Sequence, residues 1–266
     1  MIPTIGVFDS GLGGLTVLRE IHRQIPGASV LYLADTANVP YGDKPLEVVR
    51  DLALRLSDHL VSAGVRLIIM ASGTSTAAGL EAALSRYPGL PILGTIAPGA
   101  RAAMQAGSGP VGVLATNATV QSLAFTRAVH SMDPQRVVCE QGCPAFVPLV
   151  ENGRAESAEA EERASEYLEP LRRAGAQSII LGCTHFPFLL PALHRAVCRM
   201  ADPAFRPRFI DPSEEAVRDA SALLPASALP RRGTTSFAAT GDTELFRHHA
   251  SALLGEVIPA VDTMTL

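Results

Sequence analysis

Aromatic residues and an excess of charge are what this chain mostly lacks. It contains no Trp, aromatic residues make up 5% of its 266 positions, and its formal net charge is -4 at pH 7. So small a charge gives no electrostatic footprint for nucleic acid or for an anionic membrane. We therefore expect a small-molecule partner, with no nucleic acid and no membrane involved.

Cysteines and long apolar runs are also scarce. The four cysteines are Cys139, Cys143, Cys183 and Cys198. They are too few for a disulfide framework in a chain of this length, and the first two have no matching second pair, so we expect reduced thiols and no metal. No apolar run approaches the roughly 20 residues of a membrane-spanning helix, and no signal sequence is evident. We expect a cytoplasmic protein.

Short apolar segments alternate with longer amphipathic ones along the chain. This alternation predicts an α/β fold with mainly parallel sheets and helices on both faces. Strands are predicted at residues 5–8, 30–33, 67–70, 111–114, 178–181 and 209–210. Helices are predicted at residues 15–24, 45–63, 76–85, 120–130, 158–174 and 188–200.

One segment of the chain occurs twice. Residues 63–72 recur as residues 174–183, with an Ala-Gly turn, an apolar run and a polar end in each copy. Ser72 and Cys183 occupy the same place in the two copies. Because parallel α/β sheets carry their sites at the carboxyl ends of strands, two related halves would place this hydroxyl and this thiol across one cleft.

A second pair of matching segments, residues 5–10 and 111–116, supports the duplication. We expect two pseudo-symmetric, doubly wound domains with the active site between them. Proline-bearing stretches place the boundaries, so that residues 1–96 and 207–266 form the first lobe and residues 97–206 the second.

Two polar loops follow the first two predicted strands. The glycine-rich run at residues 9–16 opens a helix, where backbone N–H groups commonly hold an anion, although a tight turn explains the glycines equally well. Asp9 could orient an ammonium group or assist a base, and Ser10 lies beside it. The loop at residues 35–42 holds Tyr41 in a turn, which suits a surface loop as well as a substrate clamp.

The Cys183-Thr184-His185 triplet is the sharpest chemical signal. A thiol ionises near pH 8.5 in model peptides and becomes a base near neutrality beside a cation or a helix end, and His185 is a plausible neighbour. The alternative is a small buried cysteine next to a core histidine. The strand-end position and the matching loop at Ser72 favour chemistry.

Several blocks of the sequence resemble the bacterial glutamate racemases. The resemblance extends from residue 5 to about residue 245, and it is carried by residues 9–17, 35–42, 148–151, 182–187 and 240–242. It implies a two-domain enzyme that uses no cofactor and interconverts L- and D-glutamate to supply D-glutamate for peptidoglycan. A homodimer is one candidate assembly, and the sequence does not reveal the oligomeric state.

The resemblance fails at one of the two catalytic positions. The family uses two cysteines, one on each face of the substrate α-carbon, and the second matches Cys183. The first lies in a block that usually reads Ala-Cys-Asn-Thr, whereas this chain has Ala71-Ser72-Gly73-Thr74. A serine hydroxyl ionises near water's value of about 15.7, so forming this base costs on the order of 10 kcal/mol more than forming a thiolate. We expect efficient two-base racemisation to be impaired.

Three explanations for this departure remain open on the sequence. An introduced cysteine-to-serine change would explain Ser72 but not Gly73. A natural one-thiol enzyme would resemble the arylmalonate decarboxylases of the same superfamily, whose bulkier substrate would suit a pocket enlarged at Gly73. A catalytically silent relative would only bind an amino acid or a partner protein.

The match to the amino-acid enzymes is better, and it assigns the site residues. The resemblance implies Cys183 as the surviving acid and base opposite Ser72, with support from Asp9, His185 and Glu151. The residues expected to bind substrate are Ser10, Pro40, Tyr41, Gly42, Gly73, Thr74, Thr116, Thr119 and Thr184.

Overall fold

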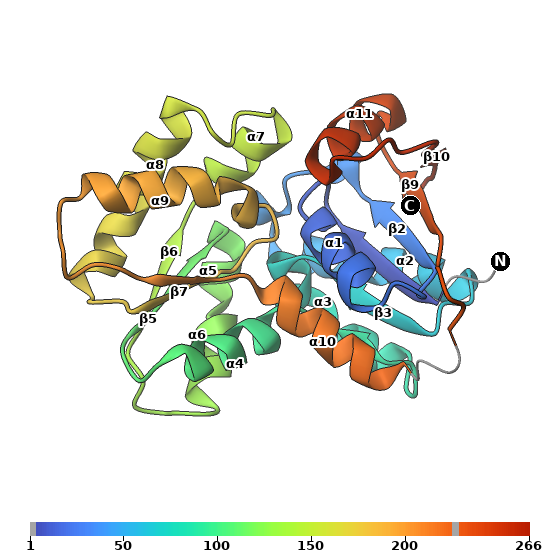
Figure 1. Ribbon diagram of the computed structural model, residues 1–266. Coiled ribbons are helices and arrows are strands. Elements are labelled where there is room, and N and C mark those ends of the chain that lie inside the picture. The colour runs from blue at the N-terminus through green and yellow to red at the C-terminus, as the bar shows by residue number, and fades with distance from the viewer. Residues whose placement is uncertain (1–3, 225–228) are drawn as a thin grey trace.

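Two α/β lobes lie side by side in the computed structural model, which describes residues 4–224 and 229–266 (Figure 1). The first sheet consists of β1 (Ile5–Asp9), β2 (Val30–Ala34), β3 (Leu67–Met70), β4 (Ile92–Leu93), β9 (Thr235–Ala239) and β10 (Asp262–Thr263), in the order β10-β9-β2-β1-β3-β4. The second consists of β5 (Val111–Ala115), β6 (Val138–Gly142), β7 (Ser178–Leu181) and β8 (Arg208–Ile210), in the order β6-β5-β7-β8. The described strand pairs are parallel, which confirms the predicted fold class.

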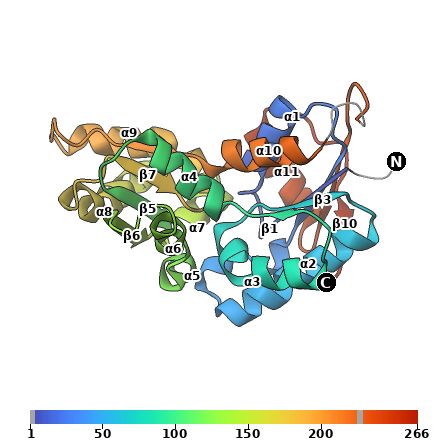
Figure 2. The same ribbon diagram turned by 90° about the horizontal axis from the view of Figure 1, so that it is seen from below.

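Helices cover both faces of the first sheet. They are α1 (Leu15–Gln24), α2 (Leu46–Ser62), α3 (Gly73–Arg86), α10 (Pro212–Leu223) and α11 (Thr243–Leu254). Figure 2 shows α1, α10 and α11 on one side of the strands and α2 and α3 on the other. Side chains alternate along β1, so Ile5 and Val7 pack in the core with α1, whereas Phe8 packs with Leu56 of α2.

The second lobe has the same layered plan. Its helices are α4 (Ile96–Ala106), α5 (Asn117–Ser122), α6 (Ala124–His130), α7 (Phe146–Glu151), α8 (Ala158–Arg173) and α9 (Leu190–Arg199). Short 3-10 turns complete the description: η1 (Thr36–Asn38), η2 (Tyr41–Asp43) and η3 (Phe186–Leu189). No helix in the described part of the chain is long and apolar enough to cross a membrane.

The six predicted strands are present, and four strands of the described residues were missed: β4, β6, β9 and β10. β9 begins with the polar pair Thr235-Ser236 before its buried end. β4 and β10 have two residues each, and β6 reads Val-Cys-Glu-Gln-Gly with every residue half-buried. A half-buried edge strand does not need the apolar run by which buried strands are recognised. The helix predicted at residues 120–130 is wrong as one unit, because Leu123 has φ 52° and separates α5 from α6.

The two sheets share their connectivity. The order β2-β1-β3-β4 in the first sheet has its counterpart in β6-β5-β7-β8. Gly64 and Gly175, in the two Ala-Gly turns, have φ values of 78° and 67°, a backbone conformation that favours glycine. The equivalent loops after β3 and β7 therefore begin at equivalent places in the two lobes.

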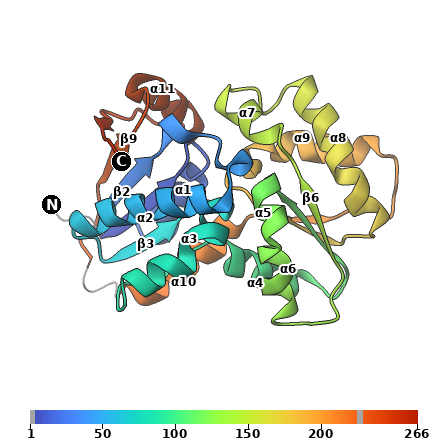
Figure 3. The ribbon, with the colours of Figure 1, turned by 180° about the vertical axis from the view of Figure 1, so that it is seen from behind.

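The chain passes between the lobes twice. The first crossing lies between β4 and α4. β8 still pairs with β7, so the second crossing lies after Ile210 rather than at residue 207. With that correction, the division into lobes remains our proposal. Figure 3 shows α3 and α5 meeting between the lobes.

Candidate active site

The carboxyl ends of β1 and β3 in the first lobe face those of β5 and β7 in the second. Thr184, just after β7, places its Oγ1 3.0 Å from Asp9 Oδ2 and 3.0 Å from the Ala71 carbonyl oxygen. Ser10, Ser72 and Thr184 are all at least nine-tenths buried. The expected cleft is therefore closed, with hydroxyl groups at the interface between the lobes.

Cys183, His185 and Glu151 form a chain of side chains in the second lobe. Cys183 Sγ lies 3.6 Å from His185 Nδ1, and His185 Nε2 lies 2.6 Å from Glu151 Oε1. Burial disfavours protonation of His185, but its contacts with Cys183 and Glu151 outweigh burial and raise its pKa well above the usual 6.5. Burial likewise opposes ionisation of Glu151, yet the His185 hydrogen bond lowers the pKa of this carboxyl. The pair is therefore a carboxylate and an imidazolium near neutral pH.

The glycine-rich loop after β1 contacts Glu151 and His185 directly. The Leu12 N–H donates to Glu151 Oε1 at 2.9 Å. A Cβ at Gly11 would lie 2.4 Å from the same oxygen, and one at Gly13 would lie 2.3 Å from His185 Nδ1. Of the two readings left open for this loop, the backbone N–H of Leu12 does bind an anion, a carboxylate of the opposite lobe, and the glycines permit its approach.

Asp9 is a buried carboxylate of the first lobe. Its Oδ1 accepts a hydrogen bond from the Gly11 N–H at 2.8 Å, and its Oδ2 accepts one from Thr184. Burial raises the pKa of the Asp9 carboxyl, while the charge of His185 opposes part of that rise. This carboxylate lies where it can face a substrate cation.

Ser72 caps helix α3. Its Oγ accepts a hydrogen bond from the Ser75 N–H at 3.2 Å, and its carbonyl accepts one from the Thr76 N–H at 2.9 Å. This cap explains why α3 begins at Gly73 and not at Thr76, where the sequence predicted it.

Three threonines form a closed triangle across the interface. Thr74 Oγ1 lies 2.9 Å from Thr116 Oγ1 and 3.2 Å from Thr119 Oγ1, and the last two lie 2.9 Å apart. Each hydroxyl has one proton to donate, and the triangle joins the beginnings of α3 and α5. All three residues were predicted at the site from the sequence.

The Tyr41 loop contacts the second lobe, and its Tyr41 hydroxyl is hydrogen-bonded within the first lobe. Tyr41 Oη donates to Asp35 Oδ2 at 2.6 Å, and burial together with Asp35 raises the pKa of Tyr41 well above its usual value. Because the Tyr41 hydroxyl gives its proton to Asp35, its oxygen can only accept from a substrate, and the assignment of Tyr41 to substrate binding stays a prediction. A Cβ at Gly42 would lie 2.6 Å from Thr116 Cβ, which places the loop against the threonine triangle. Pro40 precedes Tyr41 and is half-buried.

Asp35 is a buried residue that the sequence did not single out. Its Oδ1 accepts hydrogen bonds from Asn38 Nδ2 at 2.9 Å and from Thr240 Oγ1 at 2.7 Å. These contacts join the Tyr41 loop to the loop after β9. Asp35 could have been recognised from the sequence by its position directly after the second predicted strand.

The expectation of an enlarged pocket at Gly73 is wrong. A Cβ at this position would lie 2.1 Å from the Gly182 carbonyl oxygen. The space is taken by the backbone of the opposite lobe, because a glycine lets the two chains approach. This removes the argument for the bulkier substrate of a decarboxylase.

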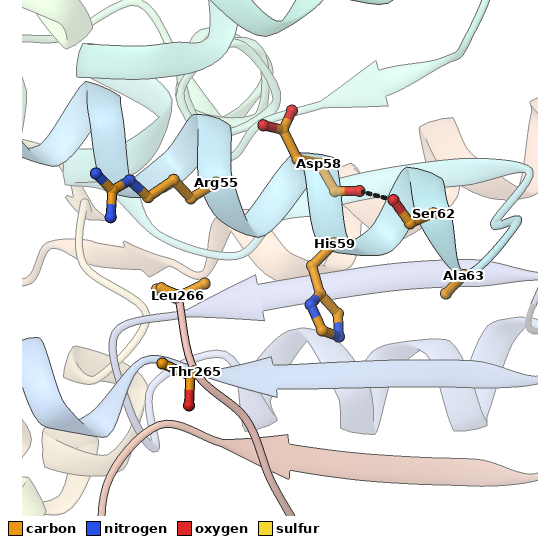
Figure 4. A pocket seen from close by; sticks show the side chains of 7 residues that line it. All are labelled: Arg55, Asp58, His59, Ser62, Ala63, Thr265 and Leu266. Carbon is orange, nitrogen blue, oxygen red and sulfur yellow. Dashed lines mark hydrogen bonds between the residues drawn. The ribbon is translucent and has the colours of Figure 1, made fainter.

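Other polar groups lie away from this interface. A hollow of about 570 Å³ is lined by Arg55, Asp58, His59, Ser62, Ala63, Thr265 and Leu266 (Figure 4). It lies along α2 and includes none of the predicted site residues. His248 and His249 belong to α11.

Comparison with known proteins gives consistent matches. The family model for Asp/Glu/Hydantoin racemase matches residues 5–220. A glutamate racemase from Gloeobacter violaceus is 42% identical over 264 residues, covering 98% of this chain and 96% of the relative. The glutamate racemase isoform RacE1 from Bacillus anthracis has a TM-score of 0.90 at 33% identity, covering 99% of this chain and 98% of the other. A glutamate racemase from Francisella tularensis, solved in complex with D-glutamate, has a TM-score of 0.90 at 27% identity, covering 99% and 98%.

Proposed function

Because the chain belongs to the Asp/Glu/Hydantoin racemase family, we propose that its closed cleft binds glutamate between the thiol of Cys183 and the hydroxyl of Ser72. The chain is an amino-acid racemase, an isomerase, by its relatives. D-glutamate for peptidoglycan is the product that follows from this family. The presence of D-glutamate in the Francisella tularensis relative supports the same ligand here.

The groups around the cleft suit an acidic amino acid. Asp9 supplies a buried carboxylate for the ammonium group. The hydroxyls of Thr74, Thr116 and Thr119 can donate to carboxylate oxygens once they turn from one another. The start of α3, a helix of 14 residues, adds backbone donors and the positive end of its dipole.

On this basis, proton exchange proceeds at Cys183. The thiolate removes the α-proton, the C–H electron pair moves into the α-carboxylate to form an enediolate, and the thiol returns a proton to the same carbon. His185 stabilises the sulfur negative charge through Nδ1, and Glu151 holds the imidazolium at Nε2. Ser10 and Thr184 are the hydroxyl groups assigned to hydrogen-bond the substrate beside the reacting carbon.

Ser72 limits the exchange on the opposite face. A hydroxyl base costs on the order of 10 kcal/mol more to form than a thiolate, and about 1.36 kcal/mol corresponds to a tenfold rate change. The observation that carries the proposal is this asymmetry: the second lobe has a complete Cys183-His185-Glu151 relay, and the first has a helix-capping serine. The chain is therefore proposed to exchange the α-proton far faster than it inverts the centre.

Incubation with L-glutamate and, separately, D-glutamate in D₂O tests this proposal. The expected result is deuterium at the α-carbon of one enantiomer with little inversion, measured by mass spectrometry after chiral separation. Equal labelling and inversion of both enantiomers would contradict the impairment at Ser72. Binding of glutamate without any exchange would favour a silent relative.

A further inference from the structure

Gly73 and Thr184 occupy matching positions, because Ser72 and Cys183 do. Thr184 reaches across the interface and brings its hydroxyl oxygen to 3.0 Å from the Ala71 carbonyl. At the mirror position Gly73 faces the Gly182 carbonyl but has no side chain with which to donate. The two lobes are therefore related in backbone but unequal in cross-lobe hydrogen bonds.

The Gly182 carbonyl is left without a donor. Gly182 is buried, and its N–H donates to the Leu114 oxygen at 2.7 Å, just as the Ala71 N–H donates to the Phe8 oxygen at 2.9 Å. Within residues 4–224 and 229–266, no hydrogen bond to the Gly182 oxygen is found. A buried carbonyl is normally paired, so this oxygen is an acceptor awaiting a donor.

We propose that the Gly182 carbonyl accepts a hydrogen bond from the ammonium group of the substrate. This rests on the proposed function and adds a recognition element to it. An ammonium group has three N–H donors and no acceptor, so it can donate to a carbonyl oxygen. A carboxylate has only acceptors and cannot. Gly73 makes the arrangement possible, because any Cβ there would occupy the position 2.1 Å from the oxygen.

The proposal predicts selection for an amino group at the α-carbon. Glutarate has both carboxylates of glutamate but no ammonium group, so it leaves the Gly182 oxygen unpaired. Glutamate supplies the missing donor. The two ligands therefore separate this contact from the binding of the carboxylates.

The sequence provides a direct spectroscopic probe. Only Gly142-Cys143 and Gly182-Cys183 are Gly-Cys peptide bonds in this chain. Full-length protein labelled with 1-¹³C glycine and ¹⁵N cysteine therefore gives two peaks in an HNCO spectrum. A Cys143→Ala variant removes one peak and assigns the other to Gly182, while Gly142 serves as the internal control.

We expect glutamate to move the Gly182 carbonyl resonance downfield, as acceptance of a hydrogen bond does, and to leave Gly142 in place. We expect glutarate to leave Gly182 unchanged. An equal Gly182 shift with both ligands would overturn the proposed hydrogen bond to the Gly182 oxygen but not the proposed function. The absence of a shift, while calorimetry shows that glutamate binds, would do the same. Failure of glutamate to bind at all would overturn the proposed function with it.

Two glycine variants add a test by affinity. In Gly73→Ala the added methyl would lie 2.1 Å from this backbone oxygen, so the lobes must shift and both ligands should bind more weakly. Glutamate should lose about tenfold more affinity than glutarate, the loss expected for one hydrogen bond. Gly107→Ala is the matched control, because its added methyl meets no atom within 4 Å. Equal weakening of both ligands in Gly73→Ala would mean that Gly73 sets the closure of the lobes and not ammonium recognition.

Discussion

At the scale of single residues, the two halves of the site differ by chemistry rather than by placement. Ser72 and Cys183 follow equivalent strands, and both are buried with less than a tenth of their surface exposed. Only Cys183 has a neighbouring imidazole that can stabilise a negative charge. Replacement of a thiol by a hydroxyl at one strand end is therefore enough to make the site one-sided.

Ser72→Cys should restore a base on the impaired face. The new sulfur would lie at the start of α3, where the helix end and the Ser75 N–H favour a thiolate. We expect the racemisation rate to rise at least about 100-fold, equivalent to about 2.7 kcal/mol of barrier, measured by circular dichroism of glutamate. Ser85→Ala, on the exposed part of α3, is the control. An unchanged rate would contradict the view that position 72 is the main defect.

Glu151→Gln should lower the pKa of His185. The carboxylate raises that pKa, so its loss should bring the imidazole titration toward lower pH, as followed by NMR of the labelled ring. An unshifted titration would mean that Glu151 does not hold the proton on the ring.

The same pair sets a pH window for stability. Because the pKa of His185 is raised on folding, its protonation adds to the free energy of unfolding. This stabilisation is complete below the unfolded pKa of 6.5 and is lost as pH rises through the folded pKa. Because the pKa of Glu151 is lowered on folding, its ionised form also stabilises the fold. This stabilisation is complete above the unfolded pKa of 4.5 and is lost as pH falls through the folded pKa. Glu151→Gln should therefore lower the free energy of unfolding most between pH 4.5 and pH 6.5, by about 2 kcal/mol. Urea unfolding across this pH range measures the loss.

At the scale of elements, sequence patterns predicted the buried strands and several helices but not their ends. β3 and β7 are short apolar runs flanked by Ala-Gly turns, so their bounds could be read directly. The start of α3 depended on a side-chain cap that periodicity does not reveal. The break between α5 and α6 depends on the positive φ of Leu123, a residue that rarely adopts it.

The triangle that joins α3 to α5 makes an element-scale prediction. Thr119→Val keeps the shape but removes one hydroxyl from the triangle, so we expect about 1 kcal/mol lower stability and weaker glutamate binding. Thr234→Val, at an exposed position, is the control. Urea unfolding and calorimetry measure the two effects, and equal behaviour of both variants would contradict a role for the triangle.

At the scale of the whole molecule, the repeat predicted facing halves, and motifs placed the same residues in one region. The geometry of the relay from Cys183 to Glu151 could not be predicted, because the contact of His185 with Glu151 joins residues 34 positions apart. The filled space at Gly73 likewise depends on how closely the lobes approach. Distances across an interface are set by packing that no local pattern contains.

The closed interface means that the lobes must separate for substrate to enter. Cys198 is exposed and Cys183 is buried, so a thiol reagent should label Cys198 first. Bound glutamate should slow labelling of Cys183 further and leave Cys198 unchanged, as mapped by mass spectrometry of peptides. Labelling of Cys183 as fast as that of Cys198 would contradict a closed cleft.

The ratio of α-deuterium incorporation to inversion, measured for L- and D-glutamate in D₂O, tests the central claim most directly. A site with one thiol base should incorporate deuterium into one enantiomer many times for each inversion, and Ser72→Cys should bring the ratio toward unity. A ratio near unity in the unaltered protein would contradict the account, because it would mean that both faces of the α-carbon already exchange protons equally well.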